Sequence, residues 1–206
     1  MKESSRRVME KAYKCTTNDE TLQLYDELGE NCQVVLLDGG YDAPNSIAVA
    51  MNKVIEKDSL ILDVGCGTGL LAEYLKIHGF YNIDGMDALR NMVNICKEKK
   101  LYKNVIKQDV RYVSLNSELN EKYDVVVGCG IFTIAHLNPK YLINLFRWLK
   151  ENGTLIVSCT QPILNQFEME ISKINNLFCE NVIIKESMTL NYKKGYSYKI
   201  YFLKKI

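Results

Sequence analysis

The sequence has few of the features that mark secreted, extended or membrane-spanning chains. Only three of its 206 residues are proline, and no Gly/Ser-rich linker divides it. Its longest apolar run without a charge, residues 125–135, is well short of the roughly 18 residues that a membrane-spanning helix needs. The first 14 residues mix Lys, Arg and Glu and lack the apolar stretch of a secretory signal. We therefore expect no membrane association.

Cysteine spacing excludes two further classes. The chain has seven cysteines, an odd number, and no two of them form a CxxC pair. This pattern indicates neither a zinc site nor a disulfide framework, so no metal is expected. Free thiols in a chain without a secretory signal are typical of a reducing compartment, which predicts a cytoplasmic protein.

Neither sign of charge is in excess. Lys and Arg number 26 against 25 Asp and Glu, for a net charge of +1. Proteins that bind nucleic acid usually carry a clear basic excess, so such a partner is not expected. With 47% apolar and 25% charged residues, the composition is that of an ordinary globular protein, and 206 residues suit one domain.

Strand-like and helical segments alternate through the middle of the chain. Strands are expected at 60–64, 81–86, 104–106, 123–127 and 154–159, and helices at 69–78, 91–99 and 139–150. This alternation predicts a parallel sheet covered on both faces. Two further strand-like runs, 181–190 and 196–203, have no room for a helix between them and should form an antiparallel hairpin. The fold class is therefore α/β, with a doubly wound, mostly parallel sheet and a C-terminal antiparallel hairpin.

The N-terminal quarter of the chain is expected to be helical. Thr17 with Glu20 forms a capping-box pattern, which predicts a helix that ends at Gly29. A second helix starts near Pro44 and buries Ile47, Ala50, Val54 and Ile55 at helical spacing. We expect a flexible polar leader at 1–15 and a single domain at 16–206, made of a helical lid (16–56) and a core (57–206).

The clearest motif is the glycine-rich turn from Asp63 to Gly69, between a buried strand and a helix. A dinucleotide-binding loop has its third glycine three positions after the second, but here the distance is two and Leu70 occupies the dinucleotide position. Asp63 would also repel a pyrophosphate. The same carboxylate suits a cofactor that ends in a cationic amino acid.

Two more acids end the next two strands. A carboxylate at Asp87 can accept two hydrogen bonds from a ribose diol. Asp109 can accept a hydrogen bond from the exocyclic amine of an adenine, while Val110 covers the adenine ring. The carboxyl ends of parallel strands line one crevice, where open α/β sheets bind ligands, so the three acids should lie together.

This arrangement resembles the class I S-adenosylmethionine-dependent methyltransferases over about residues 20–206. The segment Tyr123 to Gly130 resembles the fourth motif of that family. The resemblance implies a Rossmann-like methyltransferase fold with seven strands, S-adenosylmethionine as cofactor, and a cofactor site. The residues implied for this site are Asp63, Gly65, Cys66, Gly67, Gly69, Asp87, Ala88, Asp109, Val110 and Cys129.

Within this class, the sequence is similar to the Williams–Beuren-region methyltransferase-like proteins. Tyr25-Asp26-Glu27-Leu28 resembles their N-terminal tyrosine-aspartate helix, and Tyr41-Asp42-Ala43-Pro44 resembles their Tyr-x-Ala-Pro segment. The resemblance implies that Tyr25 contacts the cofactor from the lid. The sequence departs from the pattern at Leu28, where Trp is usual, and at Cys32-Gln33, where a second Tyr-Asp is usual.

The segment after the fourth strand narrows the acceptor. It contains no Asn- or Asp-Pro-Pro-Tyr, and no proline precedes Cys129. Amino-directed nucleic-acid, glutamine and cytosine C5 methyltransferases are therefore not supported. We expect an in-line methyl transfer to a small-molecule or peptidic acceptor, with His136 as a catalytic polar group on the substrate side.

Other interpretations of these residues stay open. The chain could be a non-catalytic methyltransferase-fold scaffold with a protein partner, or a nicotinamide-dependent oxidoreductase. Asp87 could cap a helix, Asp109 could start a turn, and His136 could be an ordinary loop histidine. Tyr25 could be a core aromatic residue, and Cys66 and Cys129 could be small packing residues.

Overall fold

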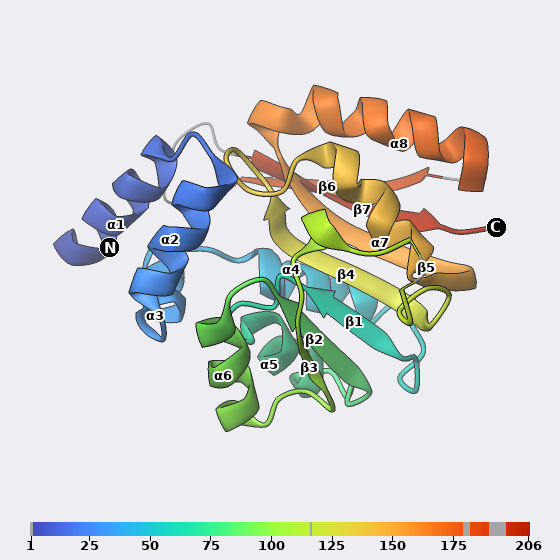
Figure 1. The fold of residues 1–206 in the computed structure, drawn as a ribbon, viewed down its shortest axis with the longest axis horizontal. Coiled ribbons are helices and arrows are strands. Elements are labelled where there is room, and N and C mark those ends of the chain that lie inside the picture. Colours follow the sequence, from blue (N-terminus) through green and yellow to red (C-terminus); the bar gives the residue numbers. More distant parts are fainter. Residues whose placement is uncertain (1, 116, 179–181, 190–196) are drawn as a thin grey trace.

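The computed structural model describes residues 2–115, 117–178, 182–189 and 197–206, and these form an α/β fold around one sheet (Figure 1). Among the described residues, seven strands lie in the order β3-β2-β1-β4-β5-β7-β6. Their bounds are β1 Ile61–Val64, β2 Ile83–Asp87, β3 Val105–Lys107, β4 Tyr123–Phe132, β5 Leu149–Thr160, β6 Val182–Thr189 and β7 Ser197–Lys204. Neighbours among β1 to β5 pair in parallel, while β7 is antiparallel to both β5 and β6. The predicted fold class and the C-terminal hairpin are confirmed; its connection, 190–196, lies outside the described residues.

The two central strands bury side chains on both faces of the sheet. Successive residues of a strand point to opposite faces. Ile61 of β1 and Val125 of β4 accordingly belong to one core, while Leu62 and Val126 belong to the other. Continuous apolar runs such as these are typical of parallel strands covered on both sides.

Helices cover both faces. The helices that follow the N-terminal region are α4 Ala43–Met51, α5 Leu70–Ile77, α6 Arg90–Lys99, α7 Leu142–Arg147 and α8 Leu164–Phe178, with short 3-10 turns η1 Val110–Tyr112, η2 Pro139–Tyr141 and η3 Gln161–Ile163. Residues of α4 and α5 pack in the core with Ile61, and residues of α7 and α8 pack in the core with Leu62. Figure 1 shows α7 and α8 together on one side of the sheet.

Three N-terminal helices lie beside the sheet: α1 Glu3–Lys14, α2 Asn18–Leu28 and α3 Asn31–Asp38 (Figure 1). The capping box that opens α2 at Thr17 is present, and Gly29 caps its other end as expected. The expected leader differs from the structure, because residues 3–14 form a helix. Ser5 on α1 is buried, and Arg6 forms an exposed ion pair with Glu10 one turn later. One face of α1 is thus inward and the other charged, a pattern that favours a packed helix.

Two helix boundaries and two further helices differ from the sequence expectation. Helix α4 ends at Met51, so Val54 is exposed, and the residues that it buries include Ile47, Ala48 and Met51. Helix α7 ends at Arg147 because β5 begins at Leu149, which pairs with Tyr123 of β4. Neither α3 nor α8 was expected. Among the described residues, no helix combines the length and apolarity needed to cross a membrane.

Candidate functional site

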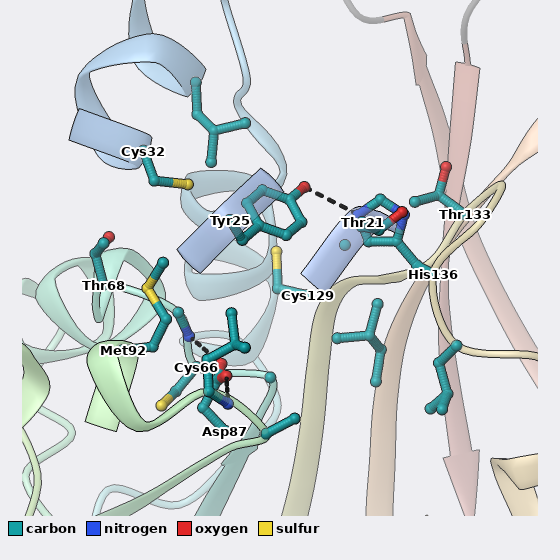
Figure 2. A pocket seen from close by; sticks show the side chains of 18 of the residues that line it. Thr21, Tyr25, Cys32, Cys66, Thr68, Asp87, Met92, Cys129, Thr133 and His136 are labelled. Atoms are coloured by element: carbon teal, nitrogen blue, oxygen red, sulfur yellow. Dashed lines mark hydrogen bonds between the residues drawn. The ribbon is translucent and has the colours of Figure 1, made fainter. Parts of the chain in front are cut away.

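A cavity of about 290 Å³ lies where the order of the strands reverses, at the carboxyl ends of β1 and β4, and the N-terminal helices also line it. This switch point is where open α/β sheets bind ligands. Eleven of the twelve residues predicted for the site line this one cavity: Tyr25, Asp63, Gly65, Cys66, Gly67, Asp87, Ala88, Asp109, Val110, Cys129 and His136. Figure 2 shows Tyr25 and His136 facing each other above Cys129, with Asp87 and Cys66 below.

The glycine loop divides into residues that face the cavity and one that does not. Gly67 has φ +53°, and a Cβ placed on it would have no atom within 4 Å, so its backbone is open to a ligand. Gly69 has φ +87° and begins α5, but a Cβ there would lie 2.5 Å from Leu101 Cδ1. Gly69 does not line the cavity. Its requirement for glycine comes from the positive φ and from close packing.

Asp63, at the end of β1, is 1% exposed. Its Oδ2 accepts a hydrogen bond of 2.7 Å from the Tyr102 hydroxyl. Burial raises the pKa of Asp63 to about 7, the Tyr102 hydrogen bond opposes this rise, and the charge of Asp87 adds to it. Burial also raises the pKa of Tyr102 far above its usual value, so Tyr102 keeps its proton and acts as the donor. Asp63 is therefore a buried carboxyl that titrates near neutral pH.

Asp87, at the end of β2, holds the glycine loop. Its Oδ2 accepts the Gly67 N–H and its Oδ1 accepts the Leu89 N–H, both at 2.9 Å. Burial raises the pKa of Asp87, and these backbone hydrogen bonds oppose that rise. A backbone hydrogen bond from Ala88 acts in the same direction. The two oxygens of a carboxylate have about four acceptor positions, so these bonds leave acceptor capacity for a ligand hydroxyl. The geometry thus suits a diol as well as the turn.

Asp109 lines the cavity, but its carboxylate is occupied differently from the sequence expectation. Arg111 donates to both of its oxygens, with Nη2 at 2.7 Å from Oδ2 and the backbone N–H at 2.8 Å from Oδ1. Arg111 also donates from Nη1 to Asp19 Oδ1 of α2 at 2.9 Å. Asp109 therefore helps to fasten an N-terminal helix to the sheet, and its oxygens are already hydrogen bonded in this structure.

His136 and Tyr25 form a pair across the cavity. His136 Nδ1 lies 2.8 Å from the carbonyl oxygen of Ile134, so Nδ1 carries the hydrogen. Nε2 of the neutral ring is then an acceptor, and the Tyr25 hydroxyl donates to it at 2.9 Å (Figure 2). Burial lowers the pKa of His136, which keeps the ring neutral at physiological pH, while the Ile134 contact opposes this shift.

The residues that depart from the Williams–Beuren-region pattern contribute to the packing of α3. Cys32 is buried and packs with Met92 and Ile95 of α6. Gln33 accepts a hydrogen bond of 2.7 Å from Lys99 Nζ and donates to Glu73 Oε2 at 2.8 Å. Lys99 also donates to the Thr68 carbonyl oxygen of the glycine loop at 2.9 Å. These contacts link the lid to the loop without the second tyrosine.

Cys66 is buried and Cys129 is half-buried. The hydrogen bond with Cys96 and burial raise the pKa of the Cys66 thiol. Burial raises the pKa of Cys129 to about 12, and its Sγ lies 3.3 Å from the Tyr41 hydroxyl. Cys96 Sγ donates to the Gly67 carbonyl oxygen at 3.1 Å. Cys66 Sγ lies 3.8 Å from Cys96 Sγ. Thiols of this kind are poor nucleophiles. Among the described residues, no group of three or more His, Cys, Asp or Glu could hold a metal ion.

Sequence reasoning missed Tyr102 and Arg111, the side chains that bond Asp63 and Asp109. Neither belongs to a motif, and Tyr102 lies 39 positions from its partner. Only the tertiary structure brings Tyr102 to Asp63, whereas Arg111 is two positions from Asp109 in the sequence.

Comparisons with known proteins now bear on this geometry. Residues 62–157 match the methyltransferase domain family. Over 120 residues the chain is 31% identical to the ribosomal protein L11 methyltransferase of Lactobacillus johnsonii. This alignment covers 58% of this chain and 37% of that relative. The chain spans less than half the length of the curated relatives that it matches.

Two solved structures have the same fold. A TehB-like S-adenosylmethionine-dependent methyltransferase from Corynebacterium glutamicum superposes with a TM-score of 0.63 and 17% identity, over 88% of this chain and 98% of that one. Magnesium protoporphyrin IX methyltransferase from Synechocystis, solved with bound S-adenosylmethionine, superposes with a TM-score of 0.60 and 19% identity, over 82% and 81%. These likenesses confirm the Rossmann-like methyltransferase fold. Two of these three names give an acceptor, ribosomal protein L11 and magnesium protoporphyrin IX, and the two differ, so no acceptor for this chain follows from them.

Proposed function

From the match of residues 62–157 to the methyltransferase domain family, we propose that this chain is an S-adenosylmethionine-dependent methyltransferase that acts on a small-molecule or peptidic acceptor. The observation that carries this proposal is the convergence of the glycine loop, Asp63 and Asp87 on one cavity at the switch point of the sheet. A scaffold without turnover would keep the cavity and bind the cofactor but transfer no methyl group.

S-adenosylmethionine is the cofactor, and the residues present fit it. Asp63 faces its cationic amino-acid end, where an ionised carboxylate attracts the ammonium group. The open backbone at Gly67 lets the ligand approach closely. Asp87 accepts the ribose hydroxyls with its remaining lone pairs, and Ala88 and Val110 border the adenine. Asp109 lines the same cavity, but its carboxylate oxygens accept from the Arg111 guanidinium, so we assign it the fastening of α2 and no direct bond to the adenine amine.

The lid is the segment 16–56, together with α1. Tyr25 covers the cofactor from α2, as the resemblance to the Williams–Beuren-region proteins implies. Three contacts support a closed lid: Tyr25 with His136, Asp19 with Arg111, and Gln33 with Lys99. A closed lid excludes water from a reactive sulfonium, and its remaining cavity has to admit the acceptor.

Methyl transfer needs alignment and removal of one proton. The lone pair of the acceptor attacks the methyl carbon, the carbon–sulfur bond breaks, and its electron pair stays on sulfur. The acceptor proton passes to the Tyr25 hydroxyl while Tyr25 passes its own proton to His136 Nε2. This step requires a neutral His136 ring, which burial favours by lowering the pKa of that residue.

Calorimetric titration with S-adenosylmethionine and S-adenosylhomocysteine tests the cofactor assignment. The variant Asp87→Asn removes the charge that holds Gly67 and receives the ribose. Asp84→Asn is its matched control, since Asp84 is an equally buried aspartate on β2 that does not line the cavity. We expect micromolar binding that Asp87→Asn weakens at least tenfold and Asp84→Asn leaves unchanged. No binding at millimolar ligand would overturn the proposal.

A further inference from the structure

The charged side chains of the cavity all have the same sign and lie at one end. Of its described lining residues, those with a formal charge are Asp63, Asp87 and Asp109, each at the end of one of the strands β1 to β3, and none is Lys or Arg. Arg111, next to Asp109 in space, points its guanidinium at Asp109 and Asp19 and does not line the cavity. No cation in the described lining is therefore available to a negatively charged ligand.

The opposite end of the cavity is apolar with a few neutral polar groups. It is formed by the end of β4, the segment that follows it and the end of β5, and includes Ile131, Thr133, Ile134, His136, Leu137 and Thr160. Figure 2 shows Thr133 and His136 on this side, across from Asp87. We call these six residues the acceptor wall.

The polar atoms of the acceptor wall are suited to uncharged partners. Thr160 donates to Thr133 Oγ1 at 2.9 Å, so the Thr133 hydroxyl retains its own hydrogen for a further bond. Both nitrogens of the neutral His136 ring are already bonded, Nδ1 to the Ile134 carbonyl oxygen and Nε2 to the Tyr25 hydroxyl. The Thr133 hydroxyl can bond a hydroxyl or amine, but neither it nor the neutral imidazole can neutralise a buried anion, which is costly without a partner.

We propose that the methyl acceptor is a small, largely apolar molecule without an anionic group, which places a hydroxyl or amine between the acceptor wall and the cofactor. This inference rests on the proposed function and narrows its substrate class. The apolar side chains Ile131, Ile134 and Leu137 cover the body of the molecule. A carboxylate or phosphate would lose its water there and face three aspartates across the cavity.

Binding of two related phenols to the protein saturated with S-adenosylhomocysteine tests the inference. p-Cresol and 4-hydroxybenzoate share the phenol ring and differ in one substituent, so their affinities compare an apolar with an anionic group at the same position. We expect p-cresol to bind at least tenfold more tightly by calorimetry. Methyl transfer from radiolabelled S-adenosylmethionine to p-cresol but not to 4-hydroxybenzoate would agree. If S-adenosylhomocysteine itself does not bind, the proposed function fails and the inference with it.

The variant Ile134→Lys locates the effect. Ile134 is 43% exposed and lines the cavity, so a lysine there brings a cation to the acceptor wall without burying it fully. We expect it to reduce the preference for p-cresol at least fivefold, whereas Ile77→Lys, at a 76% exposed position on α5 outside the cavity, leaves it unchanged. Equal or tighter binding of 4-hydroxybenzoate by the natural chain, binding of neither probe, an unchanged preference in Ile134→Lys, or methylation of proteins alone would overturn the inference.

Discussion

The hydrogen bond from Tyr102 to Asp63 sets the pH at which the cofactor binds. The variant Tyr102→Phe keeps the ring, which packs against Gly85, and removes only the hydroxyl that donates to Asp63 Oδ2. A hydrogen bond to a charged group contributes about 1.5–3 kcal/mol. At about 1.4 kcal/mol per pH unit, its loss moves the pKa of Asp63 from about 7 to one or two pH units higher.

This shift has a calculable effect on affinity. Asp63 attracts the cofactor ammonium only when Asp63 is ionised, so affinity should rise with pH through about 7 in the natural chain for as long as the ammonium keeps its proton. At pH 7 about half of the natural chain is ionised at this residue, against roughly one to ten per cent of the variant. We expect Tyr102→Phe to bind S-adenosylmethionine about five- to fiftyfold more weakly at pH 7, and to approach the natural affinity above pH 9.

Calorimetric titrations from pH 5.5 to 9.5 measure this effect. The matched control is Tyr123→Phe, which removes a buried tyrosine hydroxyl that donates to Asp84 Oδ2 at 3.1 Å, away from the cavity. The control should leave the dependence of affinity on pH unchanged. A Tyr102→Phe curve that overlays the natural one would refute the conclusion that ionisation of Asp63 controls cofactor binding.

Three further changes test other parts of the site. Asp63→Asn should abolish cofactor binding yet stabilise the ligand-free fold at pH 8. The pKa of this carboxyl rises from 3.8 to about 7 on folding, so its ionisation lowers the free energy of unfolding progressively between those pH values, by about 4 kcal/mol in total. Urea unfolding should therefore show a gain in stability for the variant at pH 8 but not at pH 4. Gly69→Ala should lower the free energy of unfolding by about 3 kcal/mol and Gly67→Ala by about 1 kcal/mol, because both positions have a positive φ but only Gly69 also lacks space for a Cβ. Denaturant titrations that give the two variants equal losses of stability would contradict this. His136→Gln should slow methyl transfer about 10²- to 10⁴-fold in single-turnover assays with S-adenosylmethionine affinity within twofold, and a variant at full rate would exclude His136 as the proton acceptor.

Local patterns predicted the parts of the fold that depend on neighbouring residues. The capping box at Thr17 and the turn from Asp63 to Gly69 each lie within a few positions of sequence, and both form as expected. Helices α3 and α8 were missed. Helix α3 has no side-chain cap at its start, and its register is set by Cys32 and Gln33, whose partners lie on α5, α6 and the glycine loop.

The candidate site was predictable to the same extent. Strand ends are local features, so the acids Asp63, Asp87 and Asp109 could be assigned to one crevice. The partner of Asp63 could not, because Tyr102 lies 39 positions away and reaches it only through tertiary packing. Arg111 is only two positions from Asp109, but no motif marks it as a donor to that carboxylate. Gly69 shows the converse case: its spacing suggested a ligand contact, but its surroundings are Leu101, Cys96 and Tyr102.

The Arg111 guanidinium forms two ion pairs that differ in their exposure to solvent. Its contact with Asp109 is four-fifths covered on that carboxylate, whereas Asp19 on α2 is 82% exposed. Mobile ions screen an exposed pair strongly within a Debye length of about 8 Å at physiological ionic strength, and a covered pair much less. Added salt should therefore weaken the ion pair of Arg111 with Asp19 on α2 first, while the pair with Asp109 persists. Higher ionic strength should thus favour opening of the lid and speed the release of S-adenosylhomocysteine, although none of the residues that contact the cofactor changes.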